Sequence, residues 1–142
     1  MEIVIASAAL ATIRRHAASA PREEICGLLL GVDGRVEEAR PVRNVAADPV
    51  GSFEVDPAAL FAALRAERAG GATLLGHYHS HPAGPARPSA RDAAAAAGDG
   101  KLWLIVAGDT VAGWVSRPTG FVPVTLREVP VTRDEAPAGP AA

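Results

Sequence analysis

Three of the four histidines in this 142-residue chain lie in one short stretch, GHYHSHP, at residues 76–82. His77, His79 and His81 occupy every second position. In a strand, side chains at positions i and i+2 point to the same face about 7 Å apart, and two imidazoles at that spacing can bind one metal ion. Positions i and i+4 are about twice as far apart, so one ion is expected to bind either His77 with His79 or His79 with His81. The second pair is favoured, because His81 lies beside a loop at the strand's end.

A catalytic zinc ion takes a third ligand from the protein and leaves one position for water. Asp92, eleven residues after His81 and beyond a proline-rich loop, is predicted to lie in the first turn of a helix. From there its carboxylate can face the strand end. The water also needs a general base within hydrogen-bond reach. The acidic pair Glu23 and Glu24 precedes an apolar segment, and a carboxylate at the mouth of a buried strand is unusual for packing alone.

Three segments together, EICGLLLG, HSHP and PSARD, resemble the motif of the JAMM/MPN zinc metalloproteases, in their short prokaryotic form. In that motif a glutamate is followed by H-x-H-P and, after a fixed gap, by S-x-x-D. The resemblance covers about residues 2–117 by element order. It includes the stretch N-V-A-A-D-P…F-E-V-D-P, which bacterial members often show.

The resemblance implies a role for each matching residue. His79, His81 and Asp92 are expected to bind one Zn²⁺ with a bound water. Glu24 is expected to act as general base and acid, and Ser89 to stabilise the oxyanion of the tetrahedral intermediate. Family members often carry an aromatic or aliphatic residue at the position of His77, which implies that His77 packs against or supports the site.

The remaining pattern predicts a mixed α/β chain. Strands are expected at 2–5, 24–31, 36–42, 53–55, 72–81, 101–108, 111–117 and 121–129. Helices are expected after Ser7, after Asp56 and from Ser89 to Gly98, each opened by a capping side chain. The resemblance implies the MPN/JAMM fold, a central mixed β-sheet flanked by helices and similar to that of cytidine deaminases. It is expected as a single domain over residues 1–132, with a disordered tail at 133–142.

Several residues also have simpler structural interpretations. Ser89 and Asp92 form a helix-capping box in their own right, and capping is compatible with catalysis. Glu23 is expected to be solvated and Cys26 to be a small buried filler. The absence of a C-x-x-C pair excludes the zinc deaminase signature. His16 is expected to be exposed on the first helix.

The composition restricts the class of partner. The formal net charge is −2 and the arginines are scattered, which argues against nucleic-acid binding. The N-terminal residues do not resemble a signal peptide, and no apolar run reaches the length of a membrane span. A cytoplasmic protein that binds neither nucleic acid nor membrane is expected, and the oligomeric state is left open.

The resemblance also implies a reaction. The expected substrate is the amide bond after the C-terminal Gly-Gly of a ubiquitin-like or sulfur-carrier protein. The reaction is either deconjugation or release of a C-terminal amino acid such as cysteine. Two alternatives stay open, a catalytically silent scaffold of the same fold and a metallopeptidase for another small amide. Retention of every motif residue favours an enzyme.

Overall fold

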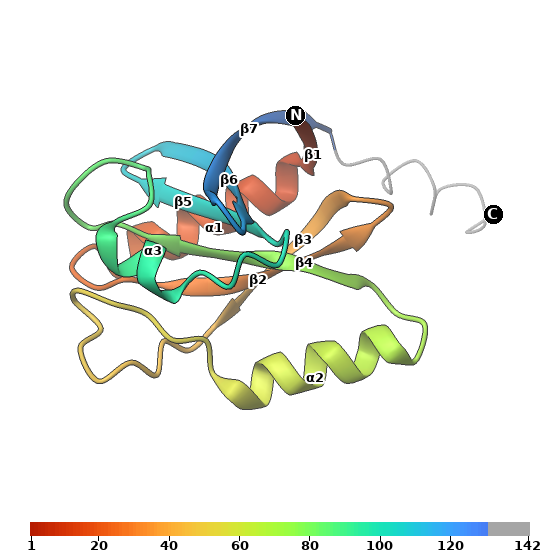
Figure 1. The fold of residues 1–142 in the computed structure, drawn as a ribbon, viewed down its shortest axis with the longest axis horizontal. Helices are drawn as coiled ribbons and strands as arrows, with labels where there is room; N and C mark the ends of the chain where they lie inside the picture. The colour runs from red at the N-terminus through yellow and green to blue at the C-terminus, as the bar shows by residue number, and fades with distance from the viewer. Residues whose placement is uncertain (131–142) are drawn as a thin grey trace.

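Seven strands and three helices build the fold in the computed structural model, which describes residues 1–130 (Figure 1). The predicted domain end at 132 and the predicted tail at 133–142 lie outside the described residues. The elements follow in the order β1 (Glu2–Ala6), α1 (Ser7–Ser19), β2 (Cys26–Val32), β3 (Arg35–Val42), α2 (Pro57–Arg68), β4 (Thr73–Ser80), α3 (Ala90–Ala95), β5 (Leu102–Ala107), β6 (Thr110–Arg117) and β7 (Gly120–Val129).

The strands form one mixed sheet, as predicted, in the order β1-β3-β2-β4-β5-β6-β7. β4 and β5 run parallel, and so does β1 beside both of its neighbours. β1 pairs along its whole length with β7 and meets β3 at Ile5 and Val36, which closes the sheet on itself. This closure was not predicted, because it joins strands at opposite ends of the chain.

Two apolar clusters lie on the two faces of the sheet. Leu29 of β2 packs in the larger cluster with Leu10 and Ile13 of α1. Its neighbours Leu28 and Leu30 pack in the smaller cluster with Ala63 of α2. Figure 1 accordingly shows α2 below β2 and β4, and α1 on the opposite side of these strands.

A bulge in β4 changes which residues share a face. Leu30 pairs with Leu74 and Leu29 pairs with Gly76, so Leu75 has no counterpart in β2. A leftover residue of this kind shifts the alternation of side chains along a strand. Leu74 therefore faces the α2 cluster, and His77, three residues later, lies on that same face opposite Leu28.

The helix ends match the sequence in part. The Asp56 carboxylate caps α2 by accepting the N–H of Ala58, as predicted. The prediction that Ser7 caps α1 is wrong. β1 runs directly into the helix, so Ala6 takes the cap position and the Ser7 hydroxyl donates to the carbonyl of Val129 at 3.0 Å.

The third helix is shorter than predicted. It ends at Ala95 rather than Gly98, because Ala96 is already extended. The amide of Gly98 donates instead to the hydroxyl of Ser116, which draws the chain toward β6. None of the helices in the described residues combines the length and apolar character that a bilayer crossing requires.

Candidate metal site

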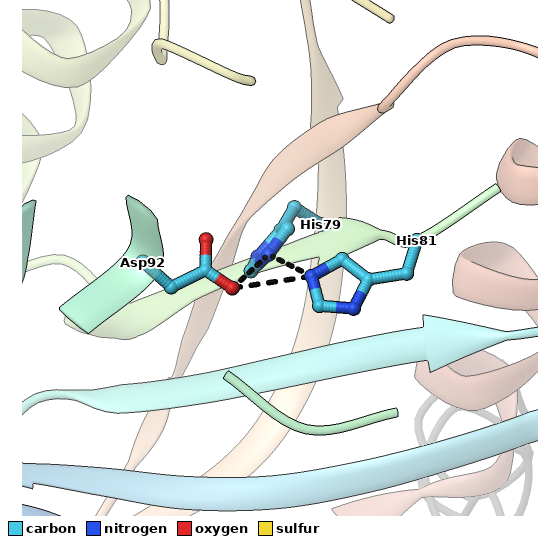
Figure 2. Close-up of side chains that lie close together, drawn as sticks. All are labelled: His79, His81 and Asp92. Atoms are coloured by element: carbon cyan, nitrogen blue, oxygen red, sulfur yellow. Dashed lines mark hydrogen bonds and ion pairs between the residues drawn. The ribbon is translucent and has the colours of Figure 1, made fainter. Parts of the chain in front are cut away.

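Three donor atoms converge beyond the end of β4. The Nε2 atoms of His79 and His81 lie 3.1 Å apart, and Asp92 Oδ2 lies 3.2 Å from the first and 3.1 Å from the second (Figure 2). The three side chains are close to fully buried. The structure thus brings together the three residues that the sequence predicts as metal ligands.

This triangle has the dimensions of a metal site. Ligand atoms about 2.0–2.1 Å from a tetrahedral zinc ion lie about 3.3 Å from one another. Two imidazole nitrogens and one carboxylate oxygen form a donor set typical of catalytic zinc, which leaves one position for water. The residues therefore fit a zinc ion, in agreement with the prediction.

Two of the three pKa shifts at the triangle, those of Asp92 and His79, also suit a cation. Burial alone would raise the pKa of Asp92, but hydrogen bonds from His79 and His81 outweigh it and hold that pKa below its usual range. Burial lowers the pKa of His79, whereas the hydrogen bond to Asp92 raises the pKa of His81. An ionised carboxylate and a neutral imidazole are the forms in which these side chains bind metal.

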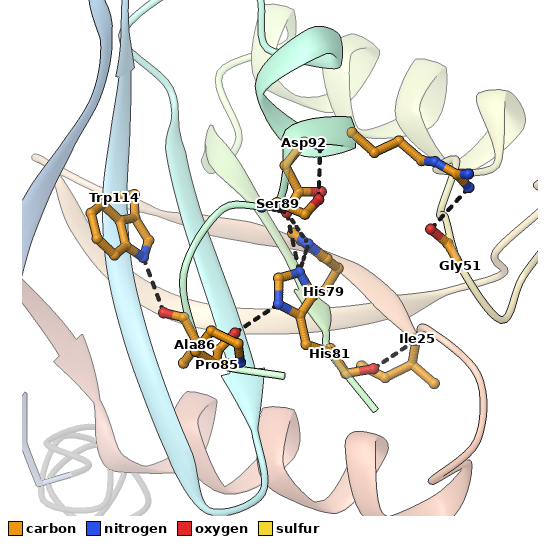
Figure 3. Close-up of polar contacts among 11 residues, drawn as sticks. Ile25, Gly51, His79, His81, Pro85, Ala86, Ser89, Asp92 and Trp114 are labelled. Atoms are coloured by element: carbon orange, nitrogen blue, oxygen red, sulfur yellow. Dashed lines mark hydrogen bonds and ion pairs between the residues drawn. The ribbon is translucent and has the colours of Figure 1, made fainter. Parts of the chain in front are cut away.

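Neighbouring groups fix the orientation of the two imidazoles. His81 Nδ1 donates to the carbonyl of Pro85 at 2.8 Å, which leaves Nε2 free for a metal (Figure 3). Trp114 Nε1 donates to the next carbonyl, that of Ala86, at 3.3 Å. The ring of Phe53 stacks on His79 with centroids 4.2 Å apart and planes 18° apart. The loop between the second histidine and the aspartate is thereby anchored at two consecutive carbonyls.

Ser89 and Asp92 form the predicted capping box. Ser89 Oγ accepts the N–H of Asp92 at 3.0 Å, and Asp92 Oδ2 accepts the N–H of Ser89 at 2.9 Å. The box orients the same oxygen that faces the two histidines. Because the Ser89 hydroxyl serves here as an acceptor, its proton stays available for donation.

Glu24 lies in the segment that leads into β2. Its Oε1 is buried and has no hydrogen-bond partner among the described residues. Burial raises the pKa of Glu24 to about 7, an effect that the charge of His81 opposes and that of Asp92 reinforces. A carboxyl group with a pKa near neutrality can accept a proton and return it, as the resemblance implies for this residue.

Ser80, between the two histidines, ties this segment to β4. Its hydroxyl accepts the N–H of Ile25 at 2.9 Å and donates to the carbonyl of Glu23 at 3.4 Å. The N–H of Ser80 in turn donates to the carbonyl of Ile25 at 3.0 Å. The strand that carries the histidines therefore also holds both neighbours of Glu24.

Gly27, the first glycine of the EICGLLLG segment, has a packing role. Gly27 pairs with Tyr78 across the strands, and a Cβ on Gly27 would collide with the Tyr78 ring and with the carbonyl of Arg40. The Tyr78 hydroxyl lies 2.7 Å from His16 Nδ1. His16 is half-buried there rather than exposed, so that prediction is wrong.

His77 is not part of the triangle. Its imidazole packs edge-on against Trp103, and burial lowers its pKa to about 4. Its Nδ1 is buried and has no partner among residues 1–130. Glu23 is exposed and Cys26 is buried, as predicted.

The sequence analysis assigned no role to single residues of the loop between β3 and α2. Asn44 hydrogen-bonds the carbonyl of Glu24, and Phe53 stacks on the ring of His79. Arg91 joins α3 to this loop by donating to the carbonyl of Gly51 at 3.0 Å (Figure 3). The signal available for Asn44 was an asparagine two residues after the end of β3, at the start of a loop, where its side chain often bonds the backbone two residues on.

Comparison with known proteins adds independent evidence. The model of a family described as prokaryotic homologs of the JAB domain matches residues 6–119. A desampylase of Haloferax volcanii is 41% identical over 102 residues, which cover 70% of this chain and 73% of that protein. A probable TtuB-protein conjugate cleaving protease of Thermus thermophilus is 47% identical over 73 residues, 51% of this chain and 48% of that protein.

Solved structures show the same fold. A protein from Desulfitobacterium hafniense superposes with a TM-score of 0.76 at 31% identity, covering 89% of this chain and 94% of its own. A JAB1/MPN domain protein from Archaeoglobus fulgidus superposes with a TM-score of 0.58 at 22% identity, covering 89% and 97%. The predicted fold class is confirmed by these likenesses.

Proposed function

The chain belongs to the family of prokaryotic homologs of the JAB domain, and on that premise we propose that it is a zinc-dependent isopeptidase. It hydrolyses the amide bond after the C-terminal glycines of a ubiquitin-like or sulfur-carrier protein. The observation that carries the proposal is the His79–His81–Asp92 triangle together with half-buried Glu24, whose Oε1 is buried and whose neighbours in the chain are bonded to Ser80, between the two histidines. The relatives named as a desampylase and as a conjugate-cleaving protease support hydrolysis of a conjugate.

The side chains divide the work of amide hydrolysis. His79, His81 and Asp92 hold the metal. A zinc ion bound there supplies the Lewis acidity that makes water a nucleophile at neutral pH and polarises the substrate carbonyl. Glu24 takes the proton of the attacking water and delivers it to the leaving amine. Ser89 donates a hydrogen bond from its hydroxyl group to the developing oxyanion.

The thiol of Cys26 takes no part in this scheme. It is fully buried, and burial raises its pKa to about 12, so it stays protonated at neutral pH. A thiol acts as a nucleophile only as its thiolate. The proposed reaction proceeds by direct attack of water, without a covalent enzyme intermediate.

Deconjugation is favoured over release of a C-terminal amino acid. One relative is a probable conjugate-cleaving protease. The two reactions differ only in the amine that leaves. A conjugate presents a lysine side chain as the leaving amine, whereas a carrier with an extended tail presents an α-amine. Both substrates belong in the test.

The experiment compares two substrates, a ubiquitin-like protein joined to a lysine and the same protein with a C-terminal cysteine. Each is incubated with the zinc-loaded protein, with and without a chelator. We expect the conjugate to be cleaved, cleavage to stop with the chelator, and added Zn²⁺ to restore it. Glu24→Gln should abolish cleavage, whereas the matched control Glu23→Gln, one residue away and exposed, should retain it. Cleavage that survives both zinc removal and Glu24→Gln would contradict the mechanism, and a wild-type protein that cleaves neither substrate would favour the scaffold role.

A further inference from the structure

The side chain of Asn44 makes four hydrogen bonds to the main chain. Its amide nitrogen donates to the carbonyl of Glu24 at 2.8 Å and to that of Ser52 at 3.0 Å. Its amide oxygen accepts the N–H of Ala46 at 2.9 Å and that of Glu54 at 3.0 Å. An asparagine side chain has two N–H donors and two acceptor lone pairs, so every polar position of this amide is used.

Three of these bonds fold the loop between β3 and α2, and the fourth leaves it. The bonds to Ala46, Ser52 and Glu54 bring the two ends of the loop together around one side chain. The bond to the carbonyl of Glu24 reaches a segment twenty residues earlier in the chain. Asn44 therefore joins this loop to the segment that carries the proposed general base.

The main chain of Glu24 depends on the same loop for its second bond. The N–H of Glu24 donates to the carbonyl of Pro49 at 2.8 Å, and its carbonyl accepts from Asn44. Both polar main-chain groups of Glu24 are thus bonded by one loop. The Glu24 side chain, in contrast, has one buried oxygen that lacks a partner among the described residues, so its position follows from that of its main chain.

The far end of the loop contacts a proposed metal ligand. Phe53 stacks on the His79 imidazole, and it lies between Ser52 and Glu54, the two residues whose main chain binds Asn44. The same amide group therefore fixes Glu24 on one side and, through Phe53, the ring plane of His79 on the other.

We infer that Asn44 is a positioning residue that holds Glu24 in place relative to the His79–His81–Asp92 triangle. The inference rests on the proposed function, because it takes Glu24 as the group that moves the proton. A displacement of about 1 Å in a reacting group can cost on the order of 100-fold in rate. Loss of the donor half of the Asn44 amide should therefore lower kcat about 10- to 100-fold and leave KM close to its wild-type value.

The test separates the two halves of the amide. Asn44→Asp keeps an oxygen for the amides of Ala46 and Glu54 and loses both N–H donors. Asn44→Ser also loses both N–H donors without adding a charge, and its shorter side chain keeps a hydroxyl that can still accept the N–H of Ala46. The matched control is Ser52→Ala, which removes a 2.8 Å bond to the carbonyl of Asp48 within the same loop and leaves the four Asn44 bonds in place.

Three quantities are measured for each variant: kcat and KM on the conjugate, zinc content, and hydrogen–deuterium exchange of the Glu24 amide. Asn44→Asp and Asn44→Ser should both show reduced kcat, full zinc content and faster exchange at Glu24. Ser52→Ala should match the wild type in all three. If Asn44→Asp misfolds, Asn44→Ser carries the test alone.

Two results would overturn the inference. Wild-type kcat and wild-type exchange at Glu24 in an Asn44 variant would show that the amide holds only its own loop. An equal loss of kcat in Ser52→Ala would show that any loosening of the loop is sufficient. If the wild type cleaves no conjugate, the proposed function fails, but the exchange rate of the Glu24 amide still decides whether Asn44 positions that residue.

Discussion

The imidazole of His77 lies edge-on against the indole of Trp103 with ring centroids 4.4 Å apart, whereas His79, two residues later on the same face, hydrogen-bonds Asp92. The difference arises from position along β4. His79 and His81 lie at the strand end, near Asp92 of α3. His77 lies further back and packs edge-on against Phe53 and Trp103.

His77→Phe should keep the metal. A phenyl ring has a similar shape, and it removes a buried Nδ1 that has no partner among residues 1–130. We expect one zinc per chain by elemental analysis, and a free energy of unfolding within about 1.5 kcal/mol of the wild type. His79→Ala and His81→Ala should lose zinc in the same assay. Loss of zinc from the His77 variant as well would make it a ligand and contradict the assignment.

The pH dependence of cleavage should report Glu24. A general base must be deprotonated, and burial raises the pKa of this carboxyl group to about 7 in the metal-free protein. A bound cation favours the ionised form, so kcat/KM should rise with pH along a limb whose midpoint lies at or below about 7. The profile is measured at constant ionic strength. A residual rate in Glu24→Gln that keeps the same limb would assign the limb to another group.

The stability of the metal-free protein should show the opposite trend. The pKa of Glu24 is about 7 in the folded chain and 4.5 without burial, so its protonated form stabilises the fold below pH 4.5 and this contribution is lost as the pH rises through 7. Glu24→Gln stays neutral. In urea unfolding with a chelator present, the variant should gain stability relative to the wild type between pH 5 and pH 8. A constant difference across that interval would show that the Glu24 pKa is not raised.

Ser89 has two functions that substitution can separate. Ser89→Ala removes the cap and the hydroxyl donor, and should cost about 0.5–2 kcal/mol of stability and on the order of 100-fold in kcat. Ser89→Gly caps the helix almost as well, within a few tenths of a kcal/mol of serine, but has no hydroxyl. It should restore stability without restoring kcat. Recovery of both together would mean that Ser89 contributes only the cap.

Gly27→Ala should be strongly destabilising. The new methyl group would meet the Tyr78 ring and the carbonyl of Arg40, and overpacking of this kind costs about 3 kcal/mol. Gly34→Ala is the control, because no atom lies within 4 Å of its Cβ position and only its positive φ of 74° is strained, at about 1 kcal/mol. Both are compared by urea unfolding, and equal losses would show that Tyr78 yields to the methyl group.

Local signals were sufficient for part of this structure. Asp56 followed by proline starts α2, and Ser89 with Asp92 starts α3, because capping depends on residues within one turn. Alternation along β4 and the loop length placed His79, His81 and Asp92 together. Their role as zinc ligands stays a prediction, as do the roles of Glu24 and Ser89.

Long-range contacts account for the remainder. Asn44 hydrogen-bonds the carbonyl of Glu24, 20 positions earlier in the sequence. His16 hydrogen-bonds the hydroxyl of Tyr78, 62 positions later. Neither contact has a local sequence signature. Ser7 has the residue type of a helix cap, but Ala6, the extended last residue of β1, takes the cap position of α1. Closure of the sheet through β1 and β7 depends on pairing between the two ends of the described chain.

The leftover residue in β4 has a consequence for how this strand can vary. Leu75 is the extra residue that separates two stretches of regular alternation. The first directs Leu74 toward α2, and the second directs His77 and His79 toward the metal site. Substitutions on either side leave this alternation intact. Leu74 and His77 lie three positions apart, so in a strand of simple alternation either the leucine or the histidines would turn toward the face of α1. The bulge keeps both on the face of α2. In this stretch the irregular pairing with β2 decides which side chains of β4 reach the metal site.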